Sequence, residues 1–259
     1  MNETRFINRN IVLKTGIIEE TSRPSRLKTE AWALSLARNK GVNVPQVLNY
    51  YRNQNGEEVL QLTRISGSPL TTEECINDVN LLYQVGFQMN KLDTGLTSYG
   101  WIDTATSKGR HNGWESFLSA YLEQYGKRLL QEKIIEEEHL QKVRKGLEKV
   151  KLSIPTAFLV HRDLRFDNLL KDEKKLIWII DWENAILGDR LYDLALFEIR
   201  YGKGILWENL AKGYDTEIQT QKYLIYKISA LVGFTDFYRK YNLPYEAERQ
   251  KLVRLISSL

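Results

Sequence analysis

Two short segments of the sequence hold the side chains that could transfer a phosphoryl group. Residues 161–168 read His-Arg-Asp-Leu-Arg-Phe-Asp-Asn and follow an apolar run that ends at Val160. In a phosphoryl-transfer loop with the spacing His-x-Asp-x-x-x-x-Asn, the aspartate orients the substrate hydroxyl and accepts its proton, and the asparagine holds a magnesium ion. The second segment is Asp181, which ends the apolar run that starts at Leu176. The two segments predict Asp163 as the catalytic residue and Asn168 and Asp181 as magnesium ligands.

Each of these residues also has a purely structural interpretation. Asp163 and Asn168 could be ordinary turn residues, and Asp181 could accept hydrogen bonds from backbone donors at a strand end. The catalytic interpretation is favoured because an ionised aspartate beside a buried strand is costly unless it is paired, and a divalent ion removes that cost. For His161 we prefer a structural role that supports the loop backbone over a role as catalytic base.

Lys14 and Glu30 extend the hypothesis toward the start of the chain. Lys14 ends a strand-like run that starts at Ile11, and Glu30 lies on the apolar stripe of a predicted helix, between Leu27 and Leu34. An unpaired carboxylate on such a stripe would be expensive. A Lys–Glu pair would explain its position and would hold the ammonium against the α- and β-phosphates of a nucleotide. The alternative is a lysine that is simply exposed at a strand end.

The elements that must position these residues follow from the apolar pattern. In the first part of the chain we predict strands near 5–7 and at 11–14, 44–48 and 58–63, and one helix from about Pro24 to Gly41. The remainder is mainly helical, with predicted helices at 71–92, 114–130, 135–150, 192–201, 206–214, 217–241 and 245–259, a loop at 94–113 and two strand-like runs. Two lobes follow: residues 1–67 as a nucleotide-binding lobe and residues 68–259 as a catalytic and acceptor-binding lobe.

Composition and charge limit the other classes of function. The chain has 37 basic and 33 acidic residues, a formal net charge of +4, and no long run of like charges, so neither a nucleic acid nor a membrane surface is expected as a partner. No apolar run approaches the ~18 residues of a membrane span, and the start is too polar for a secretory signal. Cys75 is the single cysteine, which excludes an intrachain disulfide. These features predict a cytoplasmic protein.

With these residues in place, the chain resembles the aminoglycoside phosphotransferase family, the small-molecule branch of the protein-kinase-like fold. The resemblance covers nearly the whole chain. It rests on these residues: Lys14, Glu30, 44–48 (Val-Pro-Gln-Val-Leu), 161–164 (His-Arg-Asp-Leu), Asn168, 180–183 (Ile-Asp-Trp-Glu) and 188–195 (Gly-Asp-Arg-Leu-Tyr-Asp-Leu-Ala). It implies an α+β, bilobal fold with a small, shortened, β-rich N-terminal lobe and a mainly helical C-terminal lobe.

The resemblance also implies a role for each site residue and a set of cofactors. Lys14, paired with Glu30, would contact the phosphates of ATP or GTP, and Mg²⁺ would be the metal. The remaining roles are Asp163 as the catalytic aspartate, Asn168 and Asp181 as metal ligands, Thr63, Arg64 and Ile65 as the hinge beside the base, and His161 and Asp193 as supports of the catalytic loop.

Departures from the family pattern sharpen this interpretation. The loop has His-Arg-Asp where the family more often has His-Gly-Asp, which is a choice typical of protein kinases. However, only eleven residues separate Asp181 from Asp193, which leaves little space for an activation segment and favours a small acceptor. No glycine precedes Lys14, so a glycine-rich phosphate loop does not fit there. Either the nucleotide lobe is reduced, with Arg5 or Arg9 near the phosphates, or the start codon is assigned too late.

The sequence thus predicts an Mg²⁺-dependent phosphotransferase that moves the γ-phosphate of ATP or GTP to a hydroxyl of a small molecule. An aminoglycoside-type antibiotic is the first expectation, with antibiotic resistance as the role. The acidic residues expected to hold such a cation are Glu183, Glu198, Asp215, Glu217 and Asp236. The basic segment Arg249–Leu259 argues against that acceptor. The alternatives are a kinase of another hydroxylated metabolite, such as a sugar, choline, thiamine or an amino alcohol, and a catalytically silent nucleotide-binding pseudokinase.

Overall fold

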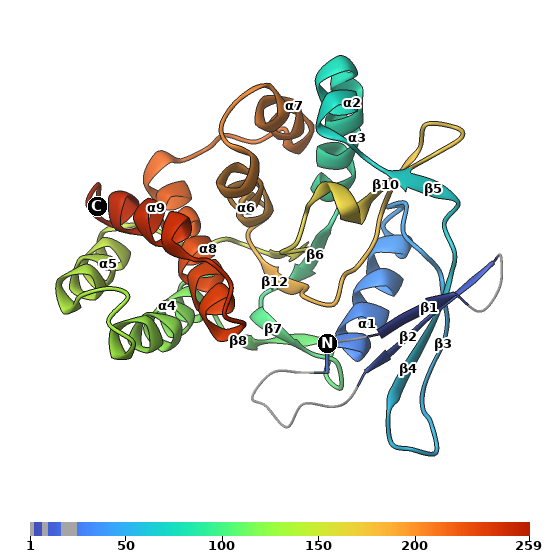
Figure 1. The fold of residues 1–259 in the computed structure, drawn as a ribbon, viewed down its shortest axis with the longest axis horizontal. Helices are drawn as coiled ribbons and strands as arrows, with labels where there is room; N and C mark the ends of the chain where they lie inside the picture. The colour runs from blue at the N-terminus through green and yellow to red at the C-terminus, as the bar shows by residue number, and fades with distance from the viewer. Residues whose placement is uncertain (1–2, 7–9, 17–24) are drawn as a thin grey trace.

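The amino-terminal part of the molecule is an antiparallel sheet with one helix packed against it. The computed structural model describes residues 3–6, 10–16 and 25–259 (Figure 1). The sheet has the strand order β1-β2-β4-β3. Its elements are β1 (Glu3–Phe6), β2 (Ile11–Gly16), β3 (Val47–Arg52), β4 (Glu58–Thr63) and α1 (Arg26–Asn39). Register is continuous from Ile11 opposite Thr63 to Gly16 opposite Glu58, which fixes the position of Lys14 on the sheet.

Helix α1 begins and ends as its sequence directs. Ser25 is the N-cap, and its hydroxyl accepts a hydrogen bond from the Lys28 amide at 3.1 Å, which satisfies one of the free N–H groups of the first turn. The helix buries Leu27, Leu34 and other apolar residues of one stripe. Gly41, just after its end, has a φ of 72°, a conformation that glycine adopts without strain. The predicted helix start at Pro24, and the predicted phosphate contact through Arg9, lie outside the described residues.

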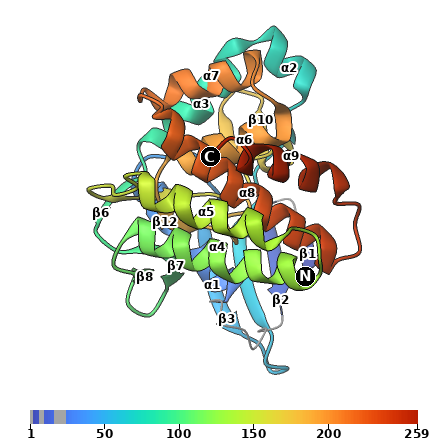
Figure 2. The same cartoon turned by 90° about the vertical axis from the view of Figure 1, so that its left-hand side faces the viewer.

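The rest of the chain consists of helices around two small sheets. The helices are α2 (Thr72–Asn77), α3 (Val79–Asn90), α4 (Trp114–Gln131), α5 (Glu137–Lys149), α6 (Leu191–Tyr201), α7 (Ile205–Tyr214), α8 (Thr220–Lys240) and α9 (Glu246–Ile256). The strands are β5 (Gly67–Pro69), β6 (Asp93–Leu96), β7 (Tyr99–Asp103), β8 (Lys108–His111), β9 (Ala157–Val160), β10 (Leu169–Asp172), β11 (Ile177–Ile179) and β12 (Ile186–Gly188). Figure 2 shows α4, α5 and α8 as neighbouring helices of this part.

The two small sheets carry the segments that matter for chemistry. One has the order β11-β10-β5 and the other the order β6-β9-β12-β7-β8. The catalytic-loop residues 161–168 therefore run from β9 in one sheet to β10 in the other. Gly67 at the start of β5 is required by close approach, since a Cβ there would lie 2.8 Å from the carbonyl oxygen of Lys171. The predicted lobe boundary at residue 67 falls where the chain leaves the first sheet and pairs with β10.

Three predicted elements differ in the structure. The strand predicted at 44–48 begins only at Val47, because Pro45 has no N–H for the ladder and Val44 is buried in the core. The helix predicted at 71–92 is interrupted at Asp78, which has an extended backbone and caps α3 by accepting from the Asn80 amide. The loop predicted at 94–113 contains strands, which pair with β9 and β12 far along the chain. A short strand that pairs only with a distant segment has little in its own residue pattern that identifies it as a strand.

The arrangement confirms the predicted α+β class, with a β-rich amino-terminal part and a mainly helical remainder (Figure 1). A contiguous core connects both parts, from Leu60 in β4 to Leu82 in α3 and Ile228 in α8. Among the described residues, no helix is long and apolar enough to cross a membrane.

Candidate active site

Lys14 joins the first sheet to both α1 and the segment after β11. Lys14 lies on β2 opposite Leu60 of β4. Its Nζ donates to both carboxylate oxygens of Glu30, at 2.8 and 2.9 Å, and to Oδ1 of Asp181 at 2.7 Å. The side chain of Glu30 is 1% exposed and that of Lys14 is 11% exposed. The ion pair expected between a strand lysine and a helix glutamate is therefore present, and it includes Asp181 as a second acceptor.

Burial and mutual attraction displace the pKa values of this group. Burial by itself would lower the pKa of Lys14, but the Glu30 and Asp181 carboxylates outweigh it and raise that pKa. Burial raises the pKa of Glu30 to about 7, because the loss of hydration exceeds the stabilisation by the Lys14 ammonium. Burial also opposes the charge of Asp181, but Lys14 holds the pKa of Asp181 below its usual value. At neutral pH Lys14 and Asp181 are charged, and Glu30 is close to its midpoint.

The backbone at Asp181 is held in an unusual conformation. Asp181 has a φ of 66° and Arg162, in the catalytic loop, has a φ of 67°, both in the left-handed region that non-glycine residues seldom occupy. Such conformations persist where surrounding contacts fix them, and they are frequent at functional sites. Trp182 provides one of these contacts, since its ring is buried and its Nε1 donates to the carbonyl of Ile179 at 3.0 Å.

Three carboxylates meet beside Lys14. One oxygen each from Glu30, Asp181 and Glu183 lies within 4.8 Å of the others. Among the described residues, Lys14 contacts Glu30 and Asp181, and Nη1 of Arg26 lies 3.2 Å from Glu183 Oε1. The negative charges of Asp181 and Glu183 both contribute to the raised pKa of Glu30, so the three carboxylates repel one another. A divalent cation between them would relieve this repulsion.

The donor atoms at this position fit magnesium. Asp181 and Glu183 offer carboxylate oxygens, which are the hard ligands that Mg²⁺ prefers. The amide nitrogen of Asn168 donates to the carbonyl oxygen of Asp163 at 2.9 Å and to its Oδ2 at 3.3 Å, which leaves the side-chain oxygen of Asn168 as the atom that could face a cation. Asn168 and Asp181 were predicted as ligands, whereas Glu183 was not.

Asp163 has basic neighbours from two elements. Arg200 of α6 donates from Nη1 to Asp163 Oδ1 at 3.0 Å. Arg165, two residues further along the loop, places its Nε 3.5 Å from Asp163 Oδ2. The Asp163 side chain is 20% exposed, so it remains accessible to a substrate. The carboxylate predicted to orient a hydroxyl thus lies between two guanidinium groups and the amide of Asn168.

The loop that carries Asp163 is fixed by hydrogen bonds to its backbone. The buried carboxylate of Asp193 accepts from the amides of His161 at 2.8 Å and Arg162 at 2.7 Å. The Asp163 amide donates to His161 Nδ1 at 3.1 Å, so Nε2 carries the proton and donates to the carbonyl of Ile180 at 2.8 Å. These contacts place His161 and Asp193 behind the loop, and they connect the loop directly to the residue that precedes Asp181.

The side chain of Arg162 lies in an aromatic environment. Its guanidinium carbon lies 4.7 Å from the ring centre of Trp101 and 5.6 Å from that of Tyr121. Cation–π contacts of this kind stabilise a desolvated guanidinium. Arg162 therefore packs the loop onto β7 and α4.

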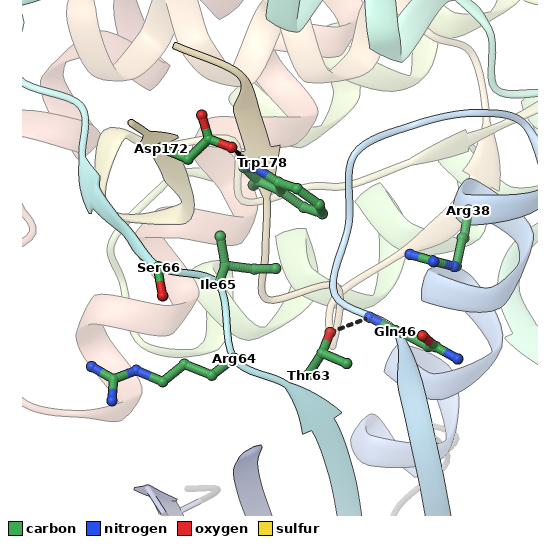
Figure 3. A pocket seen from close by; sticks show the side chains of 8 residues that line it. All are labelled: Arg38, Gln46, Thr63, Arg64, Ile65, Ser66, Asp172 and Trp178. Atoms are coloured by element: carbon green, nitrogen blue, oxygen red, sulfur yellow. Dashed lines mark hydrogen bonds between the residues drawn. The ribbon is translucent and has the colours of Figure 1, made fainter. Parts of the chain in front are cut away.

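The predicted hinge residues line a cavity at one side of the site (Figure 3). The cavity has a volume of about 360 Å³. Its walls are Arg38, Gln46, Thr63, Arg64, Ile65, Ser66, Asp172 and Trp178. The Thr63 hydroxyl accepts from the Gln46 amide at 2.8 Å, and the Arg64 amide donates to the carbonyl of Asn10 at 2.8 Å. Lys14, Asp163 and Asp181 are not among the residues that line this cavity.

Three residues that the sequence analysis did not place in the catalytic centre belong to it by position. Glu183 is two residues after Asp181, and that spacing could have suggested a second carboxylate ligand. Arg200 is seven residues after Asp193, two helical turns, so a helical wheel would have placed it on the face that meets the catalytic loop. Arg26 carries no comparable signal, because only the fold brings the start of α1 to Glu183.

A sequence profile of the Phosphotransferase enzyme family matches residues 8–218. Among curated proteins, a segment of 78 residues is 33% identical to a probable acyl-CoA dehydrogenase IBR3 from Arabidopsis thaliana. That segment is 29% of this chain and 10% of the relative, so the chain spans about a tenth of the length of the curated protein it matches.

Solved structures share the fold at low sequence identity. A thermostable mutant of aminoglycoside phosphotransferase APH(4)-Ia, in a ternary complex with AMP-PNP and hygromycin B, matches with a TM-score of 0.71 and 14% identity over 100% of this chain and 94% of that one. A putative fructosamine-3-kinase from Haemophilus somnus 129PT gives 0.66 and 19% over 99% and 90%. A choline/ethanolamine kinase family protein from Mesorhizobium loti gives 0.66 and 18% over 96% and 82%. The predicted protein-kinase-like fold is thereby confirmed.

Proposed function

This chain belongs to the phosphotransferase enzyme family, and we propose that it transfers the γ-phosphate of ATP or GTP to a hydroxyl group of a small molecule with the help of Mg²⁺. The observation that carries the proposal is the contact of Lys14 with two carboxylates that lie 16 and 167 residues away in the sequence. Such a lysine is oriented by its partners to meet the phosphates of a nucleotide. A surface lysine would not need two carboxylate partners, one of which, Glu30, is buried.

The acceptor side of the reaction is assigned to Asp163. Its carboxylate would accept the hydrogen bond of the acceptor hydroxyl and would take the proton as the oxygen attacks the γ-phosphorus. In that step a new oxygen–phosphorus bond forms, the bond from the γ-phosphorus to the bridging oxygen breaks, and ADP or GDP leaves. His161 and Asp193 support this step only through the loop, because their hydrogen bonds go to the backbone.

Asp181 and Glu183, with the side-chain oxygen of Asn168, would hold the magnesium ion. When bound, Mg²⁺ supplies positive charge to the phosphate oxygens of the nucleotide. The chain's own contribution is the group of three mutually repelling carboxylates, which makes this place favourable for a divalent cation. Thr63, Arg64 and Ile65 would face the base of the nucleotide as the hinge between the lobes.

For the acceptor, the charges of the site favour another hydroxylated metabolite over an aminoglycoside-type antibiotic. Solved structures of similar fold include an aminoglycoside phosphotransferase with hygromycin B, a putative fructosamine-3-kinase and a choline/ethanolamine kinase family protein, so the fold serves several acceptors. Most of the acidic residues expected to hold a polycation already have basic partners. Glu183 pairs with Arg26, Glu198 with Lys227, and Asp236 with Arg128 and Arg239. Antibiotic resistance and a cytoplasmic location stay predictions from the sequence.

Nucleotide titration and a release assay together test this proposal. Binding of AMP-PNP is measured by calorimetry with and without Mg²⁺, and ADP release is then followed over a panel of sugars, amino alcohols, hydroxy acids and aminoglycosides. We expect magnesium-dependent binding and release of ADP that requires both an acceptor and Asp163. Binding without turnover on any acceptor would instead favour a nucleotide-binding module.

A further inference from the structure

The carboxylate assigned to the acceptor hydroxyl lies in a basic environment. Arg200 contacts Asp163 Oδ1 at 3.0 Å and Arg165 lies 3.5 Å from Oδ2, so two guanidinium groups face one carboxylate. Asp167 also approaches Arg165, at 3.7 Å, but its side chain is 74% exposed and the pair is therefore weak. The immediate surroundings of Asp163 thus have more positive than negative charge before any substrate binds.

Arg200 has hydrogen-bonding capacity beyond Asp163. Among the described residues its only hydrogen-bond partner is Asp163, and only through Nη1. A guanidinium has further N–H donors along its other edges, and the Arg200 side chain is 27% exposed. Nε of Arg165 is buried and makes no hydrogen bond among the described residues, although it lies 3.5 Å from Asp163 Oδ2. Both guanidinium groups therefore have N–H donors that a ligand's acceptor atom could use.

Nearby acidic groups do not supply that acceptor atom. Glu198, on the same helix as Arg200, pairs with Lys227 at 3.0 Å, and Asp236 on α8 pairs with Arg239 at 3.2 Å and Arg128 at 3.5 Å. Each carboxylate therefore has a lysine or arginine other than Arg200 as its ion-pair partner, although Oε2 of Glu198 is buried without a hydrogen-bond partner among the described residues. A polycationic acceptor would meet paired acids and unpaired guanidinium donors at this position, which is the opposite of what it needs.

An aromatic strip on α8 continues the site beyond Arg200. The Arg200 guanidinium carbon lies 5.5 Å from the ring centre of Phe234. Phe234, Tyr238 and Tyr241 recur at three- and four-residue steps on the same face of α8, together with Phe237. Phe234 stacks with Tyr238, and the rings of Phe237 and Tyr241 lie 4.7 Å apart. Phe237 is 47% exposed, so part of this strip is open to a ligand.

We propose that the acceptor of this enzyme is a hydroxylated compound that carries an anionic group, with Arg200 binding that group and the α8 aromatic strip binding an apolar body. The inference rests on the proposed phosphotransferase function and names the substrate class of the same site. Arg200 would bridge the Asp163 carboxylate and the acceptor's anion, which places the hydroxyl next to the group that takes its proton. The anion is a carboxylate or a phosphate, since a guanidinium group can donate paired hydrogen bonds to either one.

Matched probes with one apolar body and three charges test this proposal. They are para-(hydroxymethyl)benzoate, para-(hydroxymethyl)benzamide and para-(hydroxymethyl)benzylamine, and para-(hydroxymethyl)phenyl phosphate distinguishes phosphate from carboxylate. Binding is measured by calorimetry on the whole protein with AMP-PNP and Mg²⁺, and transfer by ADP release with ATP. We expect an anionic probe to bind about tenfold or more tightly than the amide and the amine, as a charged hydrogen bond would give.

Arg200→Gln should remove that preference, and Arg254→Gln should retain it. Arg254 is an exposed arginine on α9, outside the site, and so controls for the loss of one positive charge. The neutral amide should bind Arg200→Gln as it binds the wild type, which also shows that the variant is folded, and the cationic amine should bind no more weakly. Arg200→Lys should keep part of the preference because the charge remains.

The inference is overturned if the amide or the amine binds as well as both anionic probes, if no probe binds, or if the preference survives in Arg200→Gln. It is also overturned if Arg200→Gln weakens AMP-PNP binding and lowers transfer to every probe equally, because Arg200 would then serve the γ-phosphate. Failure of the proposed function looks different: magnesium-dependent nucleotide binding would be present, but ADP release would not depend on Asp163 with any acceptor.

Discussion

The two halves of the site have different charge environments. Beside β2 and α1, the carboxylates of Glu30, Asp181 and Glu183 lie together, and the cations of the described residues that pair with them are Lys14 and Arg26. On the loop between β9 and β10, two arginines flank the carboxylate of Asp163, and the second carboxylate of the loop, Asp167, is largely exposed. The first half therefore favours a divalent cation, and the second favours an anion.

Burial makes this difference consequential. The Lys14–Glu30 pair is almost fully buried, whereas the Arg200–Asp163 pair has side chains that are 27% and 20% exposed. Buried charges interact strongly and are costly when a partner is lost, so the Lys14–Glu30 pair is fixed before substrate binds, whereas Asp181 and Arg26 beside it are 28% and 30% exposed. The partly exposed pair at Asp163 can exchange or share partners when a ligand arrives. The comparison suggests a rigid half that holds the nucleotide and a responsive half that receives the acceptor.

The largest expected effect is the loss of Asp163. Asp163→Ala should lower turnover by roughly 10²-fold or more, because the group that orients the hydroxyl and accepts its proton is gone. Nucleotide binding should remain, since Lys14, Asp181 and Glu183 are untouched. The check is ADP release together with calorimetry of AMP-PNP, and a thermal melt shows whether the fold is intact. Turnover close to that of the wild type would contradict the catalytic assignment.

The metal half is tested by Asp181→Asn. An amide has one oxygen fewer and no charge, so we expect magnesium-dependent nucleotide binding to be lost and removal of Mg²⁺ with a chelator to have no further effect. Asp215→Asn is the matched control, because Asp215 also has a positive φ, of 44°, but lies at the end of α7. That control should bind nucleotide as the wild type does. Unchanged magnesium dependence in Asp181→Asn would remove Asp181 from the ligand set.

The buried half should also give the enzyme a pH dependence. Burial raises the pKa of Glu30 to about 7, so Glu30 gains a proton as the pH falls through that value and stops holding Lys14 by charge. We expect kcat/KM to reach its highest value well above pH 7 and to fall as the pH drops below 7. In Glu30→Gln, kcat/KM should not fall in this way at low pH, which would remove the acidic limb of the pH profile. Its kcat/KM at high pH should be roughly tenfold lower than that of the wild type, because a charged hydrogen bond worth ~1.5–3 kcal/mol is lost.

The control for this pH profile is Glu58→Gln. Glu58 is another buried glutamate of the same sheet, and it accepts hydrogen bonds from Ser25 and Tyr50 instead of Lys14. The acidic limb should therefore remain in Glu58→Gln. A limb that persists in Glu30→Gln would show that another group produces it.

The sequence could predict the buried half better than the responsive half, and the reason is physical. Glu30 interrupts an apolar stripe, and the cost of an unpaired buried carboxylate makes a nearby lysine its expected partner. Asp163 and Asn168 are five residues apart, so their contact is local. Arg200 reaches Asp163 from another helix, and an arginine on a helix has no unusual cost that would reveal its partner. Short strands such as β6 and β12 were missed for a similar reason, because their pairing is long-range.

The smallest expected effect comes from an ion pair outside both halves. Arg144 of α5 donates to Glu123 of α4 at 2.8 and 3.0 Å and to Glu137 at 3.2 Å, but the three side chains are 36–51% exposed. Exposed pairs contribute little to stability, so Arg144→Gln should lower the free energy of unfolding only slightly and leave turnover unchanged. Arg254→Gln controls for charge.

The pH range over which its contribution is lost distinguishes this pair from the site. Arg144 lowers the pKa of Glu123 to about 2, so the stability it contributes is present above the unfolded pKa, near 4.5, and is lost as the pH falls toward 2. Denaturation of wild type and Arg144→Gln should therefore differ slightly at pH 7 and converge in acid. A difference of several kcal/mol at pH 7 would mean that exposed and buried pairs contribute alike. In that case burial could not be what separates the rigid half of the site from the responsive one.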